Sequence, residues 1–321
     1  MNDGPKLKQI LLLLGIALLA AAPGLAKGYP LSDHYDGKKF FNPGNIGQKS
    51  FGDFIKAVKE REKTPWPQWV ENENTDKPPL QNKISQIRLT YVNHASVLIQ
   101  THGLNFLTDP IWSERCSPVS FAGPKRHRAP GIHFDDLPAI HVIVISHNHY
   151  DHLDLPTLHR IEQRDRPLIL AGLGTKSFLD KEGFKNVVEL DWWQKHPYQE
   201  DTAIHFVPAQ HWSKRNFFGR DGMLWGGFVF QTPSTKIFFA GDTGYGPHFQ
   251  EIQQRFGKLD AALLPIGAYK PQWFMKNFHM GPKDAIRAFE DLGSPPPLPF
   301  ITVHFPWAQK AFMMLAATLK H

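Results

Sequence analysis

Four side chains that can bind a metal ion lie within six residues of one another in this chain. They follow the apolar run 142–145 and are His147, His149, Asp151 and His152. Imidazole nitrogens and carboxylate oxygens are ligands of Zn²⁺ and related first-row ions. The four side chains cannot all lie on one face of a helix or strand. A loop between a strand and a helix, however, can direct His147 and His149 to one side and Asp151 and His152 to another. The spacing predicts a loop that serves two metal ions.

Three further candidate ligands each follow an apolar segment of their own. His211 follows 204–208, Asp242 follows 236–240, and His304 follows 300–303. Ligands carried at strand ends across a sheet are how α/β folds build sites, which argues against the alternative of a metal-free, histidine-rich surface loop. Cys116 is the single cysteine, so nitrogen and oxygen must hold any metal.

The elements that must position these ligands alternate between strands and helices. Apolar alternation and short apolar runs predict strands at 84–92, 95–100, 105–108, 140–145, 168–171, 187–191, 204–208, 227–231, 236–240, 261–265 and 300–303. Helical spacing and end signals predict helices at 155–163, 175–181, 247–256 and 282–292. No linker interrupts the series, so we expect one α/β domain over residues 84–321.

The region before this domain has a different character. Residues 27–83 are polar and rich in Pro, Gly and Trp, and we expect an irregular arm whose aromatic side chains pack on the body. Within it, apolar residues at helical spacing predict a helix over 51–62.

The first 26 residues have the pattern of a signal peptide. Lys6 and Lys8 precede the apolar run 10–22, and Gly24 and Ala26 suit a cleavage site. An uncleaved membrane anchor is the alternative, although the run is short for a spanning helix. We therefore expect an exported protein, periplasmic or associated with the cell envelope. The formal charge of +6 is scattered, which gives no indication of nucleic-acid binding.

The ordered set His-x-His-x-Asp-His, a single His, Gly-Asp-Thr and a late His resembles the metallo-β-lactamase superfamily. That resemblance implies a four-layer αββα sandwich with a two-metal site. Further segments, from about Ser32 to His304, are similar to the family of N-acyl-phosphatidylethanolamine-hydrolysing phospholipases D and their bacterial relatives. These segments are 93–98, 107–110, 123–126, 189–193, 210–212, 239–245 and 265–269.

Carried over by position, the resemblance gives each ion its own set of ligands. One ion falls to His147, His149 and His211, the other to Asp151, His152 and His304, with Asp242 bridging both. The expected ions are two Zn²⁺, with Mn²⁺ or Fe²⁺ as alternatives. They would share a water whose pKa falls toward neutrality, so that hydroxide bridges the metals as the nucleophile.

The resemblance also implies catalytic roles and a substrate. Asp242 and Asp151 are catalytic through the metals, and Asp151 could instead carry the leaving-group proton. His279 either contacts substrate or caps the helix that begins at Pro282. The expected activity is a phospholipase D-type phosphodiesterase on N-acyl-phosphatidylethanolamine-like phospholipids. The alternatives are a lactonase or amidase of the same fold, or a cell-envelope binding protein with little turnover.

Other residues carry weaker expectations. We interpret His94 as a core histidine, and Asp109 as a turn residue whose carboxylate orients a metal-binding histidine. Basic residues at 125–128 are either a phosphate-attracting or a solvated loop. Aromatic residues at 217–218 and 273–275 suggest peripheral membrane contact, although buried packing explains them nearly as well.

The chain departs from the family pattern after His304, where Phe-Pro-Trp-Ala stands in place of Trp-Gly-Thr-Phe. The tail at 308–319 has the composition of a short helix. The departure leaves the packing behind His304 without a family precedent.

Overall fold

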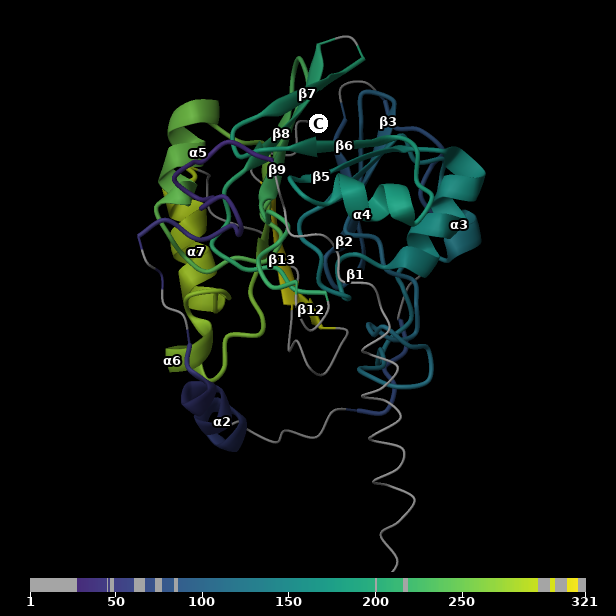
Figure 1. Cartoon of the computed structure of the whole chain (residues 1–321). Coiled ribbons are helices and arrows are strands. Elements are labelled where there is room, and N and C mark those ends of the chain that lie inside the picture. Colours follow the sequence, from purple (N-terminus) through teal and green to yellow (C-terminus); the bar gives the residue numbers. More distant parts are fainter. Residues whose placement is uncertain are drawn as a thin grey trace, which may run out of the picture.

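The computed structural model describes residues 28–44, 46, 49–60, 67–72, 77–83, 86–199, 201–215 and 219–293, and the backbone of 301–303 and 311–316. Within these residues two β-sheets lie face to face, and helices cover their outer faces (Figure 1).

The first sheet contains six strands in sequence order. They are β1 (Arg88–Asn93), β2 (Ser96–Thr101), β3 (Leu104–Thr108), β4 (Val142–Ile145), β5 (Leu168–Gly172) and β6 (Val187–Leu190). From β3 to β6 the strands are parallel, so their carboxyl ends share one edge of the sheet. Outside this sheet lie α3 (Leu155–Asp165) and α4 (Lys176–Lys181) (Figure 1).

The second sheet contains seven strands of mixed direction. Their spatial order is β12 (Ile301–Val303), β13 (Ala311–Ala316), β11 (Ala261–Pro265), β10 (Lys236–Phe239), β9 (Gly227–Gln231), β8 (Thr202–Val207) and β7 (Lys195–Tyr198). Helices α5 (His248–Phe256) and α7 (Pro282–Asp291) cover its outer face, whereas α2 (Phe51–Glu60) and α6 (Gln272–Met275) lie at one end (Figure 1).

Strand β4 shows why the layers form. Val142 and Val144 belong to the core between the two sheets, whereas Ile143 and Ile145 belong to the core under α3 and α4. Side chains alternate along a strand, so a continuous apolar run places apolar groups on both faces of the sheet. A third core, to which Phe238, Phe249 and Phe289 belong, lies between the second sheet and its helices. The expected αββα sandwich is thus confirmed.

Some expected elements differ in the structure. The tail expected to be a helix contains strand β13, which pairs with β11 and β12, so that expectation is wrong. Pairing with a strand on each side is a tertiary context that overrides the weak helical propensity of the segment. Strand β7 and helix α6 were not expected, and the first strand begins at Arg88.

The segment before the first sheet divides into packed and exposed parts. Tyr35 and Phe40 are fully buried and belong to the core between the sheets. The expected helix is α2, but its apolar face is exposed, and Trp69 is 44% exposed. The signal-peptide segment lies outside the described residues. The division of the chain at residues 26 and 83 stays a prediction.

Candidate metal centre

Six of the seven expected metal ligands lie in the part of the chain that the structure describes, where the carboxyl ends of strands from both sheets meet. His147 follows β4 of the first sheet, whereas His211 follows β8 and Asp242 follows β10 of the second. Strands β8 and β10 both pair antiparallel with β9, so they run in the same direction and end at the same edge. The sandwich thus brings together residues that are far apart in the sequence.

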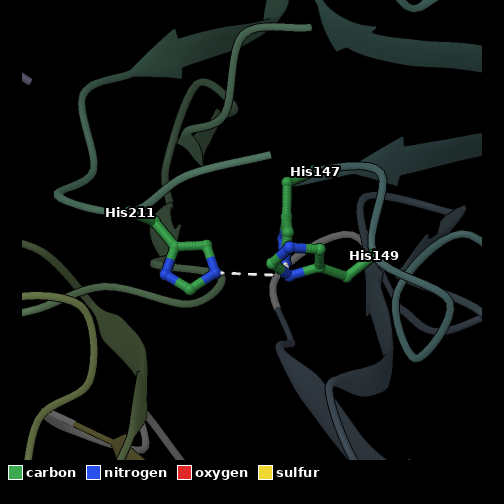
Figure 2. Close-up of side chains that lie close together, drawn as sticks. All are labelled: His147, His149 and His211. Atoms are coloured by element: carbon green, nitrogen blue, oxygen red, sulfur yellow. Dashed lines mark hydrogen bonds between the residues drawn. The ribbon is translucent and has the colours of Figure 1, made fainter. Parts of the chain in front are cut away.

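Three histidine rings converge at the centre of this edge. Figure 2 shows His147, His149 and His211 directed toward one another. His147 Nε2 lies 2.8 Å from His149 Nδ1, and His211 Nε2 lies 3.4 Å from the same atom. These three nitrogens form one of the groups whose ligand atoms all lie within 4.8 Å of one another. The geometry suits a single ion with three nitrogen ligands.

Asp242 lies between the two halves of the site. It is buried, and its carboxylate oxygens lie 3.5 Å from His152 Nε2, 3.7 Å from His211 Nε2 and 3.8 Å from His279 Nδ1. These separations exceed those of good hydrogen bonds but suit ligands of a shared ion. A carboxylate that faces histidines from both sheets fits the bridging position expected of Asp242.

A network behind the loop orients two of its histidines. Asp109 Oδ2 lies 2.6 Å from His152 Nδ1 and accepts a hydrogen bond of 2.6 Å from Ser146 Oγ. Ser146 Oγ in turn lies 2.9 Å from His147 Nδ1. With Nδ1 of each ring engaged, Nε2 of each faces the site. Asp109 occupies the orienting place expected of it, and Ser146 was not foreseen.

The second sheet orients His211 by a backbone group. His211 Nδ1 donates to the carbonyl of Phe278 at 3.0 Å, which directs Nε2 toward His149 and Asp242. The neighbouring His279 faces Asp242, and Gly281 occupies the N-cap position of α7. The structure therefore places His279 at the metal centre, not at the helix cap.

His94 is buried, as expected of a core histidine, but its partner belongs to the site. His94 Nε2 lies 2.9 Å from Asp151 Oδ2, and its ring packs edge-on against His152. His94, Asp151 and His152 form a second group with metal-ligand spacing. The signal in the sequence was its place in the short turn between two strands, where it adopts a φ of 44°.

The electrostatics of the cluster favour the neutral imidazole. Burial lowers the pKa of His147 well below its usual value, and the neighbouring His152, His149 and His211 lower it further. A neutral imidazole presents the lone pair that binds a metal. A bound cation would also attract the ring nitrogens that otherwise face one another. The donor set therefore fits first-row divalent ions.

Gly241 allows the two sheets to approach at this point. Its φ is 61°, and a Cβ atom at this position would lie 2.6 Å from Ser146 Cβ. Only glycine accepts both the left-handed backbone and the close contact. This explains in physical terms why Gly precedes Asp242.

Several basic side chains serve the scaffold. Arg126 is buried and donates to the carbonyls of Ile111 and Ser113, so it is not part of a solvated loop. Arg215 donates to the carbonyl of Leu153 at 2.8 Å and lies over the ring of Tyr150, which fixes the metal loop from outside.

Two sequence expectations fall on residues that the structure does not describe. His304 and the aromatic pair at 217–218 lie outside the described residues. The assignment of individual ligands to individual ions stays a prediction.

Comparison with known proteins places the fold in a family. Residues 104–305 match the beta-lactamase superfamily domain. An uncharacterized protein of Mycobacterium tuberculosis is 37% identical over 243 residues, which cover 73% of this chain and 64% of that protein. The N-acyl-phosphatidylethanolamine-hydrolyzing phospholipase D 1 of Caenorhabditis elegans is 37% identical over 207 residues, which cover 61% of this chain and 58% of that protein. The chain thus spans less than two thirds of the length of either relative.

A solved structure supports the same fold. A possible metal-dependent hydrolase from Veillonella parvula superposes with a TM-score of 0.53 at 18% identity, covering 65% of this chain and 82% of that one. At this identity the likeness concerns the fold alone. The matched domain and the two-sheet sandwich agree: the chain belongs to the metallo-β-lactamase superfamily.

Proposed function

We propose that this protein is a dinuclear metal-dependent phosphodiesterase of phospholipase D type, acting on N-acyl-phosphatidylethanolamine-like phospholipids. One observation carries the proposal. A buried group of histidines and a carboxylate, suited to two ions, belongs to a chain that is 37% identical to the nematode phospholipase D over the matched region. The cleaved bond would be the distal phosphate ester, which yields phosphatidic acid and an N-acylethanolamine.

The residues that would hold the ions are those that the family resemblance assigns, and the described positions of all but His304 support the assignment. His147, His149 and His211 would hold one, Asp151 and His152 would hold the other together with His304, and Asp242 would face both. When bound, two divalent ions such as Zn²⁺ would supply a water that is nucleophilic at neutral pH and would neutralise charge on the phosphate.

Two further residues would orient groups at the site. His94 Nε2 holds Asp151 Oδ2 at 2.9 Å, which fixes the direction of that carboxylate whether it acts as a ligand or as a proton carrier for the leaving group. His279 packs edge-on against His211 and faces Asp242, which supports a role in contacting substrate beside the ions.

The test is a product analysis. Protein loaded with Zn²⁺ should contain about two equivalents of zinc per chain. With vesicles of N-acyl-phosphatidylethanolamine it should release phosphatidic acid and N-acylethanolamine. Release of diacylglycerol instead would refute the phospholipase D assignment. Turnover of lactones or amides but not of the phospholipid would favour the alternative hydrolase, whose carbonyl chemistry the same ligand set allows.

We also propose that the protein contacts the membrane through helix α2. Its exposed apolar residues include Phe51 and Phe54, which are 77% and 52% exposed, together with Ile55 and Val58. Lys49 and Lys56 lie beside them, over the ring of Trp273 in α6. Exposed aromatic and aliphatic groups next to cations suit an anionic bilayer interface. Among the described residues, no helix is long and apolar enough to cross a membrane.

Liposome flotation tests this contact. The parent should float with vesicles that contain anionic lipid, and the double variant Phe54→Ser with Ile55→Ser should float less. The control is Ile286→Ser, which removes a similarly exposed apolar residue from α7. Absence of flotation of the parent with anionic and zwitterionic vesicles alike would contradict membrane contact.

Export to the periplasm or cell envelope remains part of the proposal. It rests on the charged and apolar pattern of the first 26 residues. Fractionation of expressing cells together with N-terminal sequencing tests it. Protein confined to the cytosol with its N-terminus intact would contradict it.

A further inference from the structure

Asn42 connects the N-terminal segment with the metal centre. It lies upstream of residue 104, where the matched superfamily domain begins. We propose that Asn42 is a positioning residue, which holds the backbone of His211 and thereby sets the position of that ring at the metal centre. The inference rests on the metal centre of the proposed function, although not on its substrate.

The side-chain amide of Asn42 contacts both backbone groups of His211. Its Nδ2 donates to the His211 carbonyl at 2.8 Å, and the His211 N–H donates to its Oδ1 at 3.2 Å. The indole N–H of Trp225 also donates to Oδ1, at 3.3 Å. All three contacts agree on which end of the amide is oxygen, because a rotated amide would oppose donor to donor and acceptor to acceptor.

The N-terminal segment has enough other contacts to stay in place without Asn42. Tyr35 and Phe40 are buried in the core between the sheets, and the Phe40 N–H donates to the carbonyl of Asp221 at 2.9 Å. His34 Nε2 lies 2.7 Å from Asp191 Oδ1. Loss of the Asn42 amide should therefore leave the segment docked and act on His211 itself.

His211 needs this support because it follows the end of a strand. Beyond β8 its backbone is outside the sheet, so the ladder of strand hydrogen bonds no longer fixes it. The Phe278 carbonyl fixes the ring, and Asn42 fixes the main chain. Together they set Nε2 at 3.4 Å from His149 Nδ1 and 3.7 Å from Asp242 Oδ2.

The experiment compares Asn42→Ala with Asn72→Ala in the full chain. Asn72 is a matched control, because its amide also donates to backbone carbonyls, those of Ala129 and Pro130, neither of which is an expected metal ligand. Zn²⁺ affinity is measured by competition with a chelator, the ligand field by the visible absorption of the Co²⁺ form, and folding by urea unfolding of the metal-free protein.

We expect Asn42→Ala to weaken Zn²⁺ binding by about tenfold or more, as when a group that orients a ligand is removed, and to shift the Co²⁺ absorption. Asn72→Ala should keep the affinity and spectrum of the parent. Asn42→Asp keeps an acceptor for the His211 N–H but opposes a carboxylate oxygen to the His211 carbonyl, so it should weaken Zn²⁺ binding at least as much as Asn42→Ala. This variant also provides the measurement if Asn42→Ala does not fold.

The outcomes separate this inference from the proposed function. Parent-like affinity and spectrum in both Asn42 variants would overturn the positioning role alone. So would equal losses in Asn42→Ala and Asn72→Ala, because these would show only a general effect on folding. A parent that binds neither Zn²⁺ nor Co²⁺ would overturn both the metal centre and this role. Altered metal binding without phospholipid turnover would support Asn42 while refuting the substrate.

Discussion

The two halves of the metal centre are built in different ways. On the first sheet, one loop of six residues carries His147, His149, Asp151 and His152, and neighbouring side chains orient all of them but His149. On the second sheet, His211, Asp242 and His279 come from three separate loops. There the backbone contributes through the Phe278 carbonyl and the φ of Gly241, and one side chain, that of Asn42, holds the main chain of His211.

The difference has consequences for how each half should fail. The half on the first sheet is oriented by side chains, so it should lose its geometry when one carboxylate or hydroxyl is changed. The half on the second sheet depends more on the backbone, so it should be sensitive to changes in chain conformation and packing. Asp242 faces histidines of both halves, so its loss should affect both together.

The largest effect is expected from Asp242→Asn. An amide cannot bridge two cations as a carboxylate does, so hydrolysis should fall by at least about a thousandfold, as on removal of an essential catalytic group. Turnover assays and metal analysis measure it. Asp135→Asn, an exposed change, is the control. If the parent shows no turnover and Asp242→Asn keeps the parent's ligand affinity, the protein is a binding protein. That result would contradict the proposed hydrolase activity.

Asp109→Asn tests the half that side chains orient. Asp109 accepts from Ser146 and faces His152 Nδ1, and an amide in its place offers a donor toward one of them. Metal affinity should fall by about 10- to 100-fold. Chelator competition measures the loss, with Asp180→Asn on the surface of α4 as the control. Unchanged affinity would show that the orienting network is dispensable.

Gly241→Ala tests the half that the backbone orients. A Cβ atom there adds left-handed backbone strain and a contact of 2.6 Å with Ser146 Cβ, which together should destabilise the fold by roughly 2–4 kcal/mol. Gly103→Ala is the control, because its φ of 72° carries the strain but no atom lies within 4 Å. Urea unfolding compares the two. Equal losses would mean that the approach of the sheets at Gly241 is not tight.

The smallest effect concerns His248, which lies behind Thr243 in the second half. Its Nε2 lies 3.2 Å from Thr243 Oγ1, and burial lowers its pKa to about 3. The unfolded chain binds a proton at this ring near pH 6.5, so the stabilising contribution is complete above that pH and is lost as the pH falls toward 3.

From pH 7 to 5.5 the parent should therefore lose about 1 kcal/mol more stability than His248→Gln. Urea unfolding of the metal-free protein at both pH values measures this difference. His133→Gln, an exposed change, should keep the pH dependence of the parent. The same dependence in all three proteins would show that His248 takes up its proton in the folded state.

Much of the fold could be predicted because its strands carry strong local patterns. The continuous apolar run of β4 indicated a strand buried on both faces, and the structure has apolar cores on both sides of it. Local patterns failed where pairing decided the outcome. The tail segment has helical composition but forms β13 between two strands, and the apolar face of α2 faces solvent instead of the body.

By itself the sequence determined the histidine loop, the order of the later ligands and hence the chemistry, because metal ligands are specified by residue type and short spacing. Only the tertiary structure decided which distant residues complete the centre. His94, Asn42 and the Phe278 carbonyl reach it through contacts between strand ends and loops. Such contacts depend on how two sheets pack, and no periodicity along the chain encodes that packing.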